Sequence, residues 1–457
     1  MTDISTQMFL IAVAWLGTVI FATRQLIRSP EGSVGLPIAF LFSTTFLYCG
    51  AFAYAVPGYT HLRGGGDLYL QAYHFTEATV LSGATTSLLG IVGFTVGCLL
   101  PWRPERRLPP SPARAELSPT YRNQLMTTLG LLALLGFVLN SVSIPLPLVQ
   151  AVGQVLRNVA IAFVCLGAAL AVMEDGRPYG RWILLGALIP AAYLVIWGFT
   201  SYGFLTLSVF AGFGLALLSK RRWGALRLAA IGGGLSYALL SLFVAWMSFR
   251  DELRRVLWSN AGVGERLIAI YQAFSKTVLL SPTNFASLDL LNTRLSQCIF
   301  VGKAVELHAA NPSLRQNGKT LVTALFAFVP RFMWPDKPTM NDNIFLSQNT
   351  GLIFSSTAAF GTGPVFEFFV NFGNLGVFIG FILLGVALQS IDKAAFTALK
   401  ERRLLDYVRW FVVGLAFVAP LTSFFFIVNT ALMSWIALTA LKYAMEGRRR
   451  PLTARPA

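Results

Sequence analysis

Long, uninterrupted apolar runs are the feature that most restricts how this chain of 457 residues can fold. A helix needs roughly 20 apolar residues to cross a hydrocarbon core about 30 Å thick. Continuous apolar character favours helices over barrel strands, in which polar and apolar residues alternate. The expected fold is an all-α polytopic membrane protein with about eleven crossings, over residues 7–23, 34–56, 76–100, 124–143, 151–173, 181–199, 201–219, 225–247, 364–388, 409–425 and 427–445.

Composition agrees with this class and argues against a nucleic-acid partner. Apolar residues make up 55% of the chain and charged residues only 12%, whereas soluble domains carry about 25% charged residues. The net charge of +16 comes mostly from basic residues in short loops beside the apolar runs, where they orient a membrane protein. Three of the four cysteines lie in apolar runs and only Cys298 lies outside them, so no disulfide framework is predicted.

The basic residues also predict the orientation of the chain in the membrane. They follow the first, third, fifth, seventh, ninth and eleventh spans, whereas the short loops after the even-numbered spans contain only Arg63. Because basic loops remain in the cytoplasm, the N-terminus and the long loop should lie outside and the C-terminus inside. The first apolar run lacks a cleavage-site pattern, so we expect it to be retained as a helix.

Four regions follow from these assignments. Residues 1–247 should hold eight spans, 248–363 a large outer loop, 364–445 three more spans, and 446–457 a basic inner tail. Within the loop, apolar spacing at 262–280 and 285–309 predicts amphipathic helices that lie on the membrane surface or cap the bundle. Residues 409–445 could be one span with a re-entrant segment, but a hairpin that turns near Pro420 and Asn429 keeps Arg448–Arg450 inside.

The outer loop carries more cations than anions, which is typical of a site for an anionic ligand. Most of these cations are expected to solvate helices or to contact lipid headgroups. Arg250, Arg331 and Lys337 are stronger candidates, because each stands at an apolar boundary or in the proline-stiffened segment PRFMWPDKP, residues 330–338. Arg294 is a weaker candidate from its position, and Arg157, inside the fifth span, either extends to the membrane surface or joins the same site.

Two residue types could transfer protons at the outer face. Glu367 opens the ninth span four residues before Asn371, so both should share a helical face, and the carboxylate could pair with an arginine or accept a proton from an attacking hydroxyl. His308, at the end of an amphipathic helix, is a second candidate base. The glycines at 373, 376, 380 and 385 suit close helix packing and suggest no chemistry of their own. No metal-ligand spacing or phosphate-binding glycine loop is present.

Two segments resemble the O-antigen polymerase (Wzy-type) and related exopolysaccharide repeat-unit polymerases. They are AFVPRFMWPDKP (327–338) and STAAFGTGPVFEFFVNFGNLGVFIGFILLG (356–385). The first is similar to a family segment of the form PR-hydrophobic-WP-x-KP, and the second to a helix start of the form E-x-x-x-NFG-x-x-G. The matching residues are Pro330, Arg331, Trp334, Pro335, Lys337, Pro338, Glu367, Asn371, Phe372, Gly373 and Gly376.

The resemblance implies a membrane glycosyltransferase of the GT-C type, without metal or other cofactor. Such an enzyme joins repeat units carried on undecaprenyl diphosphate at the outer face of the bacterial inner membrane, which places the N-terminus in the periplasm. Arg331, Lys337, Trp334 and Asn371 would bind the diphosphate or glycan, and Glu367 or His308 would deprotonate the acceptor hydroxyl. Membrane lipids, a chain-length regulator and a flippase are the implied partners.

Two other functions stay open at this point. An O-antigen ligase-like transferase would use the same donor and leaving group with a different acceptor. A transporter or flippase for a lipid-linked oligosaccharide should show paired repeats and broken helices that meet at the midplane of the membrane. The sequence shows neither feature, which favours an enzyme acting at the outer face.

Overall fold

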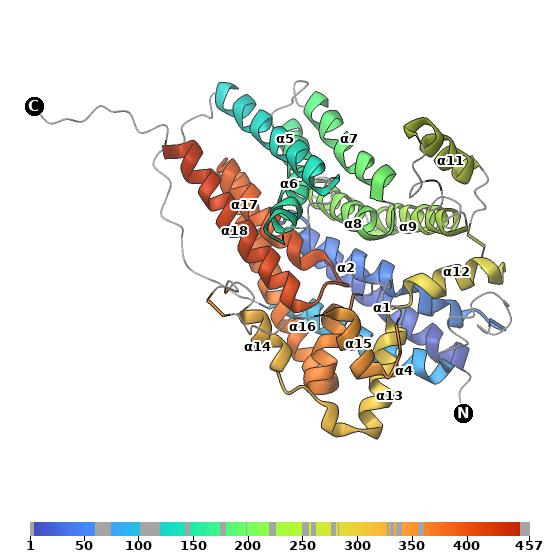
Figure 1. Ribbon diagram of the computed structural model, residues 1–457. Helices are drawn as coiled ribbons and strands as arrows, with labels where there is room; N and C mark the ends of the chain where they lie inside the picture. Colours follow the sequence, from blue (N-terminus) through green and yellow to red (C-terminus); the bar gives the residue numbers. More distant parts are fainter. Residues whose placement is uncertain are drawn as a thin grey trace, which may run out of the picture.

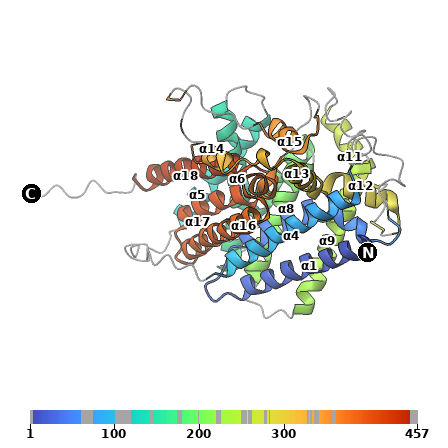
Figure 2. The ribbon, with the colours of Figure 1, turned by 90° about the horizontal axis from the view of Figure 1, so that it is seen from below.

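The chain forms a bundle of helices, and the described residues contain no strand (Figures 1 and 2). The computed structural model describes residues 4–59, 75–100, 119–141, 147–173, 180–197, 199–218, 225–248, 256, 262–275, 280–281, 283–326, 329, 333–334, 341–354 and 361–447. The all-α fold class is thereby confirmed for these residues.

Each of the eleven apolar runs coincides with a helix. These helices are α1 (Ile4–Arg28), α2 (Leu36–Tyr48) continued by the 3-10 helix η1 (Cys49–Ala55), α4 (Glu77–Leu99), α5 (Pro119–Ser141), α6 (Pro147–Met173), α7 (Gly180–Trp197), α8 (Phe199–Leu218), α9 (Ala225–Ser248), α16 (Gly363–Lys400), α17 (Leu404–Val418) and α18 (Phe424–Gly447).

Seven helices of the described chain are long and apolar enough to cross a membrane, namely α1, α2 with η1, α4, α5, α6, α16 and α18. The chain is therefore a membrane protein by the length and composition of its helices. The prediction of about eleven crossings, the GT-C architecture and the orientation stay predictions.

The core of the bundle is built on α4 and α16, which run side by side in the same direction. A side chain at Gly97 would collide with the carbonyl group of Ile382, and one at Gly385 with the carbonyl group of Phe94. Small residues let helix backbones approach closely in membranes, so the packing role predicted for Gly385 agrees with the structure. The ring of Phe94 also stacks on Phe40 of α2, with 4.3 Å between the ring centroids.

Helix α16 is interrupted at Gly373. The sequence predicts only close helix packing for this glycine. Its 38 residues would rise about 57 Å as one straight helix, far more than the membrane core. Gly373 instead adopts φ 68° and ψ −158° inside the helix, a conformation that is essentially restricted to glycine. The chain bends there, so that the ring of Phe368, before the break, packs at 5.9 Å against the ring of Phe381, after it.

Helices α17 and α18 form the predicted hairpin. The Asp406 carboxylate, near the start of α17, binds the Lys442 ammonium near the end of α18, and the rings of Trp410 and Trp435 pack at 4.6 Å. These pairs show that the two helices are antiparallel. The turn lies at residues 419–423 and contains Pro420 as predicted, but Asn429 lies inside α18 rather than in the turn.

The loop of residues 248–363 contributes short helices that pack in two places: the first two lie beside α9, and the later ones lie near α4 and α16 (Figure 1). They are α11 (Val263–Ser275), α12 (Phe285–Leu295), α13 (Cys298–Ala310), η4 (Pro312–Leu314), α14 (Lys319–Leu325) and α15 (Asp342–Thr350). The prediction of one continuous helix over 285–309 was wrong, because the chain turns at Ser296–Gln297 and the Gln297 N–H donates to the Leu47 carbonyl at 3.4 Å. The turn lets α12 pack on η1 while α13 packs on α4.

Candidate functional site

The first segment of α16, residues 363–372, places Glu367 at the start of another helix. The side chain of Glu367 is fully buried. Its Oε2 accepts a hydrogen bond from the Phe424 N–H at 2.7 Å. The first N–H groups of a helix lack acceptors within that helix, so this carboxylate caps the N-terminus of α18. Its second oxygen, Oε1, is buried, and the Thr320 hydroxyl is the nearby donor for this carboxylate.

Asn371 lies one turn later and connects α16 to the loop of residues 248–363. Its Oδ1 accepts from the Gly318 N–H at 2.8 Å, and its Nδ2 donates to the Thr320 hydroxyl at 2.7 Å and to the Glu367 carbonyl at 2.8 Å. Glu367 and Asn371 therefore share a helical face, as their spacing predicts. Because the Thr320 oxygen accepts from Asn371, its hydroxyl hydrogen is available for the nearby Glu367 carboxylate.

A second carboxylate, Asp342, approaches the same place from α15. Asn341 caps this helix by accepting from the Asn343 and Ile344 N–H groups, and the ring of Phe345 packs on Phe366 of α16 at 5.7 Å. Burial raises the pKa of Asp342, and the Ser423 hydroxyl and the Thr362 backbone lower it in part. The first turn of α15 thus lies at the junction of α16 and the α17–α18 turn.

On α13, the tautomer of His308 is determined by Asn349. The Nδ2 of Asn349 donates to the Phe345 carbonyl at 2.8 Å, so its Oδ1 faces His308 Nε2 at 3.1 Å as an acceptor. The imidazole proton therefore belongs on Nε2, which leaves Nδ1 with a free lone pair. Burial lowers the pKa of His308, the hydrogen bond that it donates to Asn349 raises it, and the charge of Arg315 lowers it.

Nδ1 of His308 is buried and has no hydrogen-bond partner among the described atoms. The imidazole ring packs against Phe369, with 5.9 Å between the ring centroids. The arrangement gives a neutral imidazole at pH 7 whose basic nitrogen is buried next to α16. A histidine in this state can accept a proton from a hydroxyl group.

Arg315 fills the break in α16. Its guanidinium lies against Gly373, so closely that a side chain at that position would collide with it. It also stands over the ring of Phe369 at 5.5 Å, while the neighbouring Gln316 N–H donates to the Val370 carbonyl at 3.1 Å. The loop around Arg315 therefore covers the end of the first segment of α16 and places a cation beside His308.

The other predicted site residues are placed less completely. Arg250, Arg331 and Lys337 lie outside the described residues, and Arg294 belongs to α12 but its side chain also lies outside the description. Arg157 is half-buried in α6, on a different helix from these groups. Trp334 is 38% exposed and packs edge-on against Phe326 at 6.1 Å.

Sequence reasoning did not single out Asp342, Arg315, Thr320, Asn349 or Ser423 as site residues. Among these residues, only Asp342 could have been found from its neighbours in the sequence. Asparagine is a favoured N-cap residue, so Asn341 predicts that a helix begins at Asp342 and that its carboxylate lies in the first turn. The others join the site through long-range packing around the break in α16.

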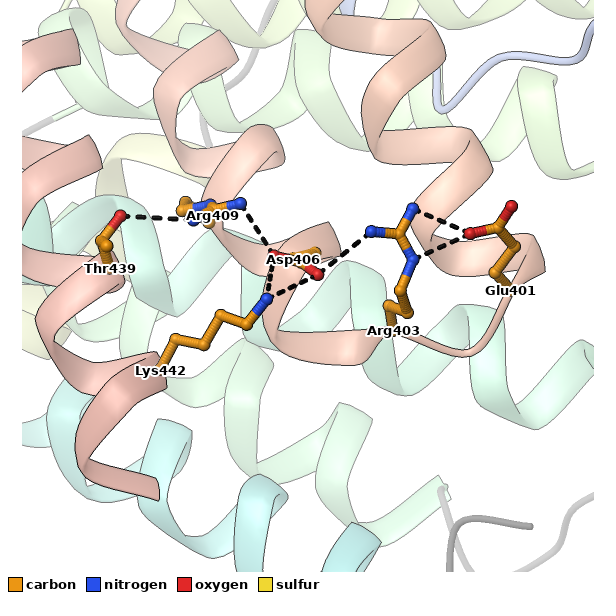
Figure 3. Close-up of polar contacts among 6 residues, drawn as sticks. All are labelled: Glu401, Arg403, Asp406, Arg409, Thr439 and Lys442. Carbon is orange, nitrogen blue, oxygen red and sulfur yellow. Dashed lines mark hydrogen bonds and ion pairs between the residues drawn. The ribbon is translucent and has the colours of Figure 1, made fainter. Parts of the chain in front are cut away.

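A separate cluster of charges lies at the other end of the hairpin (Figure 3). Its central carboxylate, Asp406, is only 4% exposed and pairs with Arg403 at 3.2 Å and with Arg409 and Lys442 at 2.8 Å each. The Arg409 guanidinium also lies over the ring of Trp435 at 4.2 Å. Each charged group drawn has an opposite partner, which indicates that the cluster fastens α17 to α18.

Comparison with known proteins gives one match. The family model of a domain of unknown function (DUF8712) matches residues 235–449, a little less than half of the chain. The matched part runs from within α9 to the end of α18 and includes His308, Arg315, Asp342 and Glu367. No curated protein and no solved structure matches the chain.

Proposed function

We propose that this chain is a membrane glycosyltransferase that polymerises undecaprenyl-diphosphate-linked repeat units at the outer face of the bacterial inner membrane. The observation that carries the proposal is His308, a neutral imidazole with a free Nδ1 that stands beside Arg315 at the break of a membrane helix. The resemblance of residues 327–338 and 356–385 to repeat-unit polymerases supplies the substrate class.

The reaction needs a base and a stabilised leaving group. The acceptor hydroxyl would give its proton to His308 Nδ1, and its oxygen would attack the anomeric carbon of the donor glycan. The bond from that carbon to the diphosphate oxygen breaks, and the lipid diphosphate leaves with the electron pair. Arg315, with Arg331 and Lys337, would stabilise the negative charge that develops on the diphosphate.

The length of α16 supports a site at a membrane boundary. At its other end, the Leu36 N–H donates to Asp392 at 2.9 Å, and Lys393 pairs with Glu31 at 2.5 Å. At about 1.5 Å per residue, the stretch from Gly373 to Lys393 rises about 30 Å, the thickness of the hydrocarbon core. If the end of α16 at Lys393 lies at the inner membrane surface, Gly373 lies about one core thickness away from it. This distance agrees with the predicted position of the break at the outer membrane surface.

One observation favours a transporter as the second candidate function. Helix α16 is interrupted at Gly373, a feature that the sequence did not reveal, and transporters often bind substrates at broken helices. Those breaks lie near the midplane of the membrane, however, whereas the length of α16 favours a boundary position for Gly373. The enzyme is therefore the preferred proposal.

Deletion of the gene in the producing bacterium tests the proposal. A polymerase mutant should display surfaces capped with single repeat units, whereas loss of every surface repeat unit would support the flippase or ligase alternative. Complementation with Arg331→Ala or His308→Ala should fail to restore polymer. The matched control is Lys319→Ala, an exposed cation of the same loop, which should restore it. Normal polymer from either test variant at wild-type protein levels would contradict the role of that residue.

A further inference from the structure

Helix α14 carries its large apolar side chains on its exposed side. Val322 and Leu325, with Phe326 at the end of the helix, stand at spacings of three and four and therefore form one stripe. They are 54%, 60% and 45% exposed, whereas Thr320 and Ala324 of the same helix are buried against the protein. A helix that faces water normally shows polar residues on its exposed side, so this pattern indicates apolar surroundings.

The polar groups beside this stripe have partners within the helix. The Thr323 hydroxyl donates to the Lys319 carbonyl at 2.9 Å, and the Phe326 N–H donates to the Val322 carbonyl at 3.3 Å. Residues 320–330 contain no charged side chain, and Lys319 and Arg331 stand at the two ends of this run. In a bilayer, polar groups must find partners in the protein, while long basic side chains can reach the headgroups. The segment therefore meets both requirements of lipid surroundings.

Contacts with two membrane helices fix the position of α14. The Gly318 N–H, just before α14, donates to Asn371 of α16 at 2.8 Å, close to the break at Gly373. Helix α14 also lies against α18 (Figure 1), which is long and apolar enough to cross a membrane and of which little is covered by the described chain. Phe426, in the first turn of α18, is 40% exposed. The stripe on α14 therefore lies beside a membrane helix whose uncovered surface is suited to lipid.

Two further apolar side chains extend the exposed surface. Trp334 packs edge-on against Phe326, with 6.1 Å between the ring centroids, and Met333 is 68% exposed. Tryptophan is enriched where a membrane meets water. With seven residues, α14 is about 10 Å long, far shorter than a hydrocarbon core about 30 Å thick. It can therefore lie within one leaflet but cannot cross the bilayer.

We propose that the α14 surface, formed by Val322, Leu325, Phe326, Met333 and Trp334, is inserted into one leaflet of the membrane and contacts the acyl chains of its lipids. This part of the loop then enters the membrane next to the break in α16. The insertion goes beyond the proposed transfer reaction and does not depend on it, since a transporter with the same contacts would hold α14 in the same place.

Spin labelling of single cysteines tests the insertion in the full-length protein, reconstituted in phosphatidylcholine vesicles. A nitroxide at Val322→Cys or Leu325→Cys should collide severalfold more often with O2, which concentrates in lipid, than with the water-soluble complex nickel ethylenediaminediacetate. Leu131→Cys, at a 62% exposed position of the membrane helix α5, is the control for lipid contact and should behave in the same way. Asn311→Cys, at an exposed position of the same loop as α14, should show the reverse preference.

The four native cysteines are buried or half-buried, so the protein without an added cysteine supplies the background signal. Val322 and Leu325 are exposed, so their replacement should leave the packing of the protein intact. More frequent collisions with the nickel complex at these positions would place the α14 surface in water and overturn the insertion. Protection from both reagents would show that protein covers the surface, such as a second copy of the chain, and would overturn it as well. Each outcome can be read whether or not the protein polymerises glycan.

Discussion

At the scale of single residues, hydrogen-bond partners from distant segments decide what each polar side chain can do. The sequence around His308 shows only that this histidine lies near the end of an amphipathic helix. In the structure it is 2% exposed and bound to Asn349, which determines the nitrogen that carries the proton. The pair Glu367 and Asn371 was predicted from spacing alone, because residues four apart share one face of a helix.

The protonation state of His308 leads to a prediction about pH. Because burial and Arg315 lower its pKa below the usual 6.5, the rate constant kcat/KM for glycan transfer should fall at acid pH with a midpoint below pH 6.5. Arg315→Ala removes a cause of the lowering, so the acid limb should move to higher pH. Asn349→Ala removes a bond that raises the pKa, so the limb should move to lower pH.

These shifts can be measured with purified protein and a lipid-linked oligosaccharide as substrate. His308→Ala should reduce kcat/KM by a factor on the order of 10² to 10⁴, as expected for loss of a general base. If Arg315→Ala lowers the rate but leaves the acid limb where it was, His308 is not the group that titrates.

At the scale of elements, α16 shows what the sequence could not specify. The apolar run, its start near Gly363 and the close packing of Gly385 on α4 all follow from composition and spacing. The break does not, because a glycine in an apolar run usually serves packing. Gly373 becomes a bend only because the loop that carries Arg315 packs against it, and that contact joins residues far apart in the sequence.

Replacement of Gly373 tests the importance of this bend. Gly373→Ala combines a disfavoured backbone conformation, which costs about 1–3 kcal/mol, with a collision at Arg315, so the yield of folded protein and its Tm should fall. Gly214→Ala in α8 is the control, since nothing lies within 4 Å of the added atom. The double variant Gly373→Ala/Arg315→Ala should recover only the part of the lost stability that the collision causes. A Gly373→Ala protein as stable as the control would contradict the break.

The α17–α18 hairpin supplies a second prediction at this scale. Asp406→Asn leaves Arg403, Arg409 and Lys442 without their shared buried counter-charge, which should destabilise the protein by about 3–5 kcal/mol. Glu401→Gln removes a carboxylate that is 52% exposed, and exposed pairs contribute about 0–1 kcal/mol. Chemical unfolding in detergent, followed by tryptophan fluorescence, compares the two variants. Equal stabilities would show that Asp406 does not fasten the hairpin.

At the scale of the whole molecule, hydropathy predicted the helices well and the site poorly. All eleven runs are helical because a membrane span must satisfy its backbone hydrogen bonds within one helix. The prediction of the number of crossings and of the orientation still depends on the placement of the basic residues. The candidate site could be anticipated only through Glu367, Asn371 and His308, because Asp342 and Arg315 reach it by packing of the loop against α16.

Accessibility of single cysteines tests the predicted orientation. In a variant without the four native cysteines, Asn311→Cys in the outer loop should react with a membrane-impermeant maleimide in intact spheroplasts. Glu401→Cys, between α16 and α17, should react only after the membrane is opened. Both positions are exposed in the structure. The reverse pattern would place the candidate site in the cytoplasm, where the proposed substrates are not expected.

The most direct test of the central claim is reconstitution of the purified protein in vesicles with labelled undecaprenyl-diphosphate-linked repeat units, followed by separation of the products by length. The wild type should convert single units into a ladder of longer glycans still attached to lipid, and His308→Ala should leave them single. Unextended units together with movement of the label across the vesicle membrane would contradict a polymerase and support a transporter.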